Sequence, residues 1–227
     1  MGVSTLGWMR RVGWWTLVTT CVVYAGFAIA MAGVEVASWV DPAIESKLRA
    51  LPRLFVVHAL SGAIALAAGP FQLHRQLRVK SPAVHRAVGW AYVFSAWTAS
   101  LTAAGLTPFF DVTWAAKLAF GALAALWFAT TTIGLRRAIA RRIAEHRAWM
   151  LRSFALALFF VTGSLWMEVS RSLPYAQEVT YPLAVFLGWS LNIAVVEGWL
   201  RLARRAKPPS DVARPAGLGS FVGTASR

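Results

Sequence analysis

Long apolar runs separated by short polar and basic segments make up most of the chain. Six runs approach the roughly 20 residues that an α-helix needs to cross the hydrocarbon layer of a bilayer. They cover residues 12–34, 51–70, 87–107, 112–135, 149–169 and 181–200. Apolar and polar positions do not alternate within the runs, as they would in the strands of a membrane barrel. The pattern predicts an all-α fold, a polytopic membrane bundle of six transmembrane helices over residues 1–206.

The C-terminal segment differs from the rest of the chain. Residues 207–227 are rich in Pro, Gly and Ser and contain few large apolar side chains. Such a segment cannot bury enough apolar surface to offset the entropy of ordering. It is therefore predicted to be a flexible cytoplasmic tail.

The overall composition agrees with a membrane protein. Hydrophobic residues make up 58% of the chain and charged residues only 14%, and the mean hydropathy is +0.56. The 12 Trp residues suit a protein that is anchored at two membrane–water interfaces. Too little polar surface remains to cover a soluble globule.

The net charge of +14 has an uneven distribution along the chain. Most of the 23 Lys and Arg residues lie before the first run, after the last one, and in the loops between the second and third and between the fourth and fifth. Cytoplasmic loops carry this excess in membrane proteins, so both termini are predicted to be cytoplasmic (N-in/C-in). The basic loops predict contact with an anionic cytoplasmic leaflet, and they exclude nucleic acid because no basic face of a soluble domain exists.

Three histidines are candidates for chemistry. His58 lies within the second run, where hydrocarbon penalises an ionisable side chain that has no partner. Gly62 and Gly69 follow at helical offsets, which would allow a flat ligand or another helix to come close. Alternatively, His58 bonds a neighbouring carbonyl and the glycines serve helix packing alone.

His85 and His146 stand at the starts of the third and fifth runs, each followed by an arginine. Two neutral imidazoles on facing helices can hold a haem iron, which makes both residues candidate metal ligands. Arg86 and Arg147 would then pair with the haem propionates. The other interpretation is that each His-Arg pair is an interfacial anchor facing anionic lipid.

Two further expectations concern polar residues of the last two runs. Glu168 and Arg171 are spaced for an ion pair, as are Glu197 and Arg201. Asn192, deep in the last run, is expected to bond across to another helix. The chain has no nucleotide-binding glycine motif, no His-Glu-x-x-His and no Gly-x-Ser-x-Gly, so the motifs leave open whether it is an enzyme.

A group of motifs occurs in a fixed order between residues 58 and 166. It comprises His58 with Gly62-Ala63, Gly69-Pro70-Phe71-Gln72, His85-Arg86 with Gly89 and Tyr92, His146-Arg147-Ala148-Trp149-Met150 and Arg152-Ser153-Phe154-Ala155-Leu156. Together they resemble the bacterial predicted membrane proteins of domain of unknown function 2306. The resemblance implies a multi-pass protein of a bacterial cytoplasmic (inner) membrane, and it brings no established activity.

A looser similarity is to six-helix di-haem cytochromes b of the ascorbate-reducible type. In that family, histidines of the second and fourth helices hold one haem, and those of the third and fifth hold the other. Here the fourth run has no histidine, so the similarity implies at most one haem b, held by His85 and His146. His58 would then lack its partner.

Two functions from different classes follow. The sequence favours a cofactor-free accessory or ligand-binding membrane protein, whose His-Arg pairs contact lipid or a partner. The alternative is a single-haem b-type membrane electron carrier using His85 and His146, which would pass electrons between a quinone and a redox partner.

Overall fold

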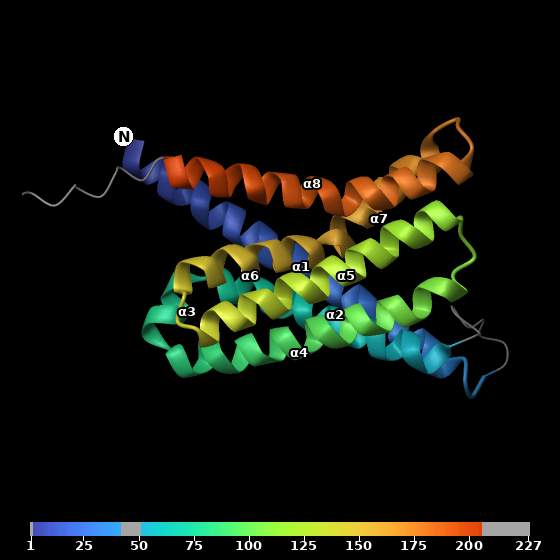
Figure 1. Cartoon of the computed structure of the whole chain (residues 1–227), viewed down its shortest axis with the longest axis horizontal. Coiled ribbons are helices and arrows are strands. Elements are labelled where there is room, and N and C mark those ends of the chain that lie inside the picture. The colour runs from blue at the N-terminus through green and yellow to red at the C-terminus, as the bar shows by residue number, and fades with distance from the viewer. Residues whose placement is uncertain (1, 42–50, 206–227) are drawn as a thin grey trace, which may run out of the picture.

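The computed structural model describes residues 2–41 and 51–205, so the predicted tail at 207–227 lies outside the described residues. Most of these residues are helical, and none of them forms a strand. The elements are α1 (Gly2–Ala37), α2 (Pro52–Leu73), α3 (Arg75–Lys80), α4 (Pro82–Leu106), the 3₁₀ turn η1 (Thr107–Phe109), α5 (Trp114–Ile139), α6 (Ile143–Ala157), α7 (Phe159–Ser172) and α8 (Gln177–Arg205) (Figure 1). The predicted all-α fold class is confirmed.

Five helical segments are long and apolar enough to cross a membrane. They are Gly7–Ala37, Pro52–Leu73, Trp114–Ile139, Ile143–Ser172 (α6 and α7 together) and Gln177–Arg205. Each corresponds to one of the predicted runs. The remaining run forms α4, which at 25 residues is long enough but carries several hydroxyl side chains that lower its hydropathy. Two of them bond carbonyls of their own helix, from Ser100 Oγ to Ala96 O (2.7 Å) and from Thr102 Oγ1 to Thr98 O (2.7 Å).

Three helices extend beyond the bounds predicted from the sequence: α2 at its C-terminal end, and α4 and α6 at their N-terminal ends. α2 does not end at Gly69-Pro70 but continues through Pro70 to Leu73. A proline removes only one donor from the helical ladder, and membrane helices tolerate this loss. α4 and α6 start at Pro82 and Ile143, earlier than the predicted 87 and 149. His85 and His146 therefore belong to first turns of helices.

The long helices pack side by side in one bundle (Figure 1). α2 packs against α1 and α4, α4 packs against α5, and α5 packs against α6 and α8. α6 also contacts α2 and α8, which places it in the middle of the bundle. In agreement with that position, every residue from Ser153 to Ala157 is buried.

The predicted fifth span, 149–169, is not one continuous helix. Helix α6 ends at Ala157 and α7 starts at Phe159, with Leu158 between them at ψ −10°. A carbonyl in the last turn of a helix lacks an intrahelical donor, and here Asn192 Nδ2 of α8 donates to Ala155 O (3.0 Å). Asn192 also donates to Thr162 Oγ1 (2.9 Å), so its predicted bond to another helix is confirmed.

Helices α7 and α8 cross at two glycines. Thr162 Oγ1 donates to Gly188 O at this crossing (2.7 Å). A Cβ atom at Gly188 would lie 2.8 Å from the Cα atom of Gly163 and 3.0 Å from Cε2 of Phe159. Small residues of this kind let two membrane helices approach until their backbones touch.

We expect Gly188→Ala to destabilise the protein by about 1–3 kcal/mol, because the new methyl group meets backbone that cannot move aside. The matched control is Gly198→Ala in the same helix, where an added Cβ has nothing within 4 Å. Thermal unfolding in a mild detergent should show a lower Tm for the first variant and an equal or slightly higher Tm for the second. Equal values for Gly188→Ala and the wild type would show that the crossing is not tightly packed.

Candidate functional site

One end of the bundle collects most of the candidate residues. The C-terminal end of α2, all of α3 and the first turns of α4 and α6 lie together there (Figure 1). We call seven side chains of this region the basic-end cluster: Gln72, Arg75, Arg78, His85, Arg86, His146 and Arg147. α4 and α6 begin here, whereas α2 and α5 end here, so the opposed helix dipoles offset one another and the charge of this end comes from the side chains.

Arg78 interacts electrostatically with several other members of the cluster. Its Nη1 donates to the carbonyls of Leu73 (3.0 Å) and Gln72 (3.3 Å), which are the last two residues of α2. Burial lowers the pKa of the Arg78 guanidinium below its ordinary value, and the charges of Arg147 and Arg75 lower it further. Arg78 thus carries its charge in a partly dehydrated position, where the exposed Arg75 and Arg147 repel it.

His146 is held in place by a backbone contact to α5. Its Nδ1 lies 2.8 Å from the carbonyl oxygen of Gly134. Because a carbonyl can only accept, Nδ1 carries the proton in this bond and Nε2 is left for another partner. The contact fixes the first turn of α6 against α5.

His85 and Gln72 each have one buried side-chain nitrogen. His85 Nδ1 and Gln72 Nε2 have no hydrogen-bond partner among the described residues. Arg78, His146 and Arg86 lie within electrostatic reach of His85. The structure therefore places His85 and His146 together at this end of the bundle, with Arg86 near His85 and Arg147 near Arg78.

Gly89 lies one helical turn after His85 on α4, on the same face of the helix. The structure places the side chain of Gln72 there, since a Cβ atom at Gly89 would lie 3.3 Å from Gln72 Oε1. Gln72 reaches α4 from the end of α2 because that helix continues beyond Pro70. Gln72 therefore belongs to the site, although the pattern of histidines and arginines in the sequence did not indicate it.

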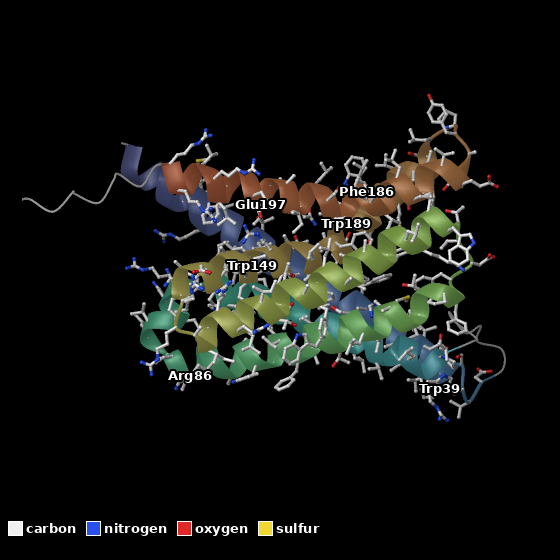
Figure 2. The ribbon with its side chains drawn as sticks, in the orientation of Figure 1. Trp39, Arg86, Trp149, Phe186, Trp189 and Glu197 are labelled. Atoms are coloured by element: carbon white, nitrogen blue, oxygen red, sulfur yellow. The ribbon has the colours of Figure 1, made fainter. Side chains whose placement is uncertain are left out.

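The cluster has no carboxylate of its own. Among the residues described, Arg75, Arg78, Arg86 and Arg147 take part in no ion pair, while the nearby Glu145 pairs with Arg137 (3.2 Å) and Arg142 (2.7 Å). Within the same residues, no group of three or more His, Cys, Asp or Glu side chains is arranged to hold a metal ion. Figure 2 shows nitrogen-bearing side chains gathered at this end, with Arg86 at its edge.

His58 is separate from this site. Its Nδ1 lies 3.0 Å from Ala99 O and 3.3 Å from Thr102 Oγ1, both on α4. Ala99 is fourteen residues beyond His85 along that helix, a distance of roughly 20 Å. His58 thus bonds a neighbouring carbonyl and links α2 to α4. Of the two glycines on its face, Gly69 packs closely against Phe154 of α6, whereas Gly62 faces open space.

A second polar site joins α6 to α8. Arg152 donates from Nε to Glu197 Oε1 (2.5 Å) and from Nη2 to Glu197 Oε2 (3.1 Å), and its guanidinium lies 4.7 Å from the ring centre of Trp149. Figure 2 labels Trp149 and Glu197 on the facing helices. The sequence paired Glu197 with Arg201 by helical spacing, and no sequence signal pointed to Arg152. The expected Glu168–Arg171 pair is present, with 2.7 Å between Arg171 Nη1 and Glu168 Oε2.

Comparison with known proteins gives one finding. No curated protein and no solved structure matches the chain. The family model described as predicted membrane protein DUF2306 matches residues 55–200, which extend from α2 into α8 and include the basic-end cluster. The match covers more of the chain than the motifs between residues 58 and 166. The chain belongs to the DUF2306 family of predicted membrane proteins.

Proposed function

We propose that the protein is a six-helix integral protein of the bacterial cytoplasmic (inner) membrane with both termini in the cytoplasm. The proposal adds α4 to the five apolar spans. At 25 residues it would extend ~37 Å, more than the hydrocarbon thickness, and its buried hydroxyls bond carbonyls of the same helix. The start of α1, α3 and the end of α8 lie at one end of the bundle, which carries most of the basic residues (Figure 1).

Within this topology, the protein acts as a cofactor-free accessory or ligand-binding membrane protein through the basic-end cluster. The observation that carries this proposal is the imbalance of the cluster, which presents arginines and histidines with no carboxylate among the described residues. Such a surplus of donors favours a partner that supplies acceptors. The anionic lipids of the cytoplasmic leaflet lie at the same level as the cluster in the proposed topology.

The alternative is a single-haem b-type electron carrier between a quinone and a redox partner. The observation in its favour is the bond from His146 Nδ1 to Gly134 O, because metal-binding histidines commonly donate their second ring nitrogen to a carbonyl. His85 and His146 would be the iron ligands, and Arg86 and Arg147 would pair with the propionates. His58 is not part of this alternative, since its Nδ1 contacts α4 far from the other two.

The topology is tested by single cysteines in a Cys21→Ser background, which removes the only native cysteine. Lys80→Cys and Ala140→Cys should react with a membrane-impermeant maleimide only after the cells are opened. Asp111→Cys and Tyr175→Cys should react in intact spheroplasts, because they would face the opposite side. All four positions are exposed. If Lys80→Cys and Asp111→Cys were labelled from the same side, α4 would not cross the membrane.

The two functions are distinguished by a reduced-minus-oxidised absorption spectrum of the protein purified in mild detergent after haem-supplemented expression. We expect no α or Soret band, because the proposed function needs no cofactor. Bands at about one haem per chain would favour the alternative. In that case His85→Ala and His146→Ala should lose the bands, while the control His58→Ala should keep them.

A further inference from the structure

Two buried nitrogens of the basic-end cluster require an explanation. Gln72 Nε2 and His85 Nδ1 have no partner among the described residues, although buried polar atoms in native proteins are almost always satisfied by protein, water or an ion. Both belong to the same locality. Gln72 lies against Gly89 of α4, which is one turn after His85 on the same helix face.

The charges around these nitrogens all have one sign. Arg78 and Arg147 are close enough to oppose each other's charge, and Arg75 adds to the repulsion. Nη1 of Arg78 is used by the end of α2, which leaves its other nitrogens for an external acceptor. Glu145, which directly precedes His146, is already shared by Arg137 and Arg142. These charges and donors thus suit an anion with several acceptor atoms.

We propose that the basic-end cluster binds a phosphate group between Arg78, Arg147, Gln72 and His85. A tetrahedral phosphate offers several acceptor oxygens to donors that come from different helices, and guanidinium groups bind it with charge-assisted hydrogen bonds. The amide of Gln72 supplies one neutral donor, and the imidazole of His85 supplies another in the tautomer that carries the proton on Nδ1. This inference rests on the ligand-binding role proposed above and names the chemistry of the ligand.

The phosphate has two sources, a phospholipid headgroup or a free phosphate compound. Thermal unfolding of the full chain in a neutral detergent distinguishes them. In one arm, phosphatidylglycerol is added and compared with phosphatidylcholine, whose choline cancels the phosphate charge. In the other arm, inorganic phosphate is titrated and compared with chloride at equal ionic strength. A saturable rise in Tm in the first arm alone assigns a lipid headgroup, and a rise in the second arm assigns a free phosphate.

The variants test the site itself. Arg147→Gln and Gln72→Leu should weaken the apparent affinity roughly tenfold each, because each removes a donor to a charged group. The matched control is Arg136→Gln, which removes the same charge from the exposed last turn of α5 outside the cluster and should leave the affinity little changed. The shift in Tm is compared with that of each ligand-free variant, so that a change in basal stability does not count as lost binding.

Two outcomes would overturn the proposal. One is equal weakening by Arg147→Gln and Arg136→Gln, which would show unspecific attraction to the basic end. The other is the absence of a saturable response to either phosphatidylglycerol or inorganic phosphate. Failure of the proposed function would appear elsewhere, in the labelling pattern of the cysteine variants or as stoichiometric haem in the spectrum.

Discussion

Burial of α6 on all sides from Ser153 to Ala157 determines how the other helices can pack. A helix with no lipid-facing side requires neighbours that leave room for it, and two glycines provide that room. Gly69 of α2 packs closely against Phe154, and a Cβ atom at Gly134 of α5 would lie 2.6 Å from Met150 Sδ. The same burial requires that the hydroxyl of Ser153 be satisfied within the bundle, because hydrocarbon offers no partner. Tyr92 of α4 and Thr131 of α5 contact it at 2.8 and 2.7 Å, so the polar centre connects three helices.

The break at Leu158 allows the two halves of one span to pack against different helices. Before the break, α6 packs in the middle of the bundle, and after it α7 packs mainly against α8 (Figure 1). No proline or glycine marks this position in the sequence. Asn192 compensates at the break, since it donates both to Ala155 O and to the hydroxyl of Thr162 beyond the break. A partly buried amide that spans the break therefore holds together the two halves of one membrane segment.

The sequence predicts the parts of this architecture that depend on local composition. Apolar runs give the position of the helices, and helical spacing gives the Glu168–Arg171 pair. Contacts between distant segments are not encoded in such patterns. Glu197 has an arginine four residues later, yet it bonds Arg152 of α6, because the packing of α6 against α8 brings the two together. Gly62 and Gly69 look equivalent in the sequence, but only Gly69 faces another helix closely.

The same limit applies to the candidate site, because its three histidines differ in what surrounds each ring. His58 bonds a carbonyl and a hydroxyl of α4, so it links two helices. His146 uses one nitrogen on Gly134 O and keeps the other, while His85 has a buried nitrogen without a partner among the described residues. Gln72 enters the site only because α2 continues past Pro70. The basic end of the bundle thus combines donors in excess of acceptors with partial burial, and this excess, rather than any histidine alone, is the physical reason to place ligand binding there.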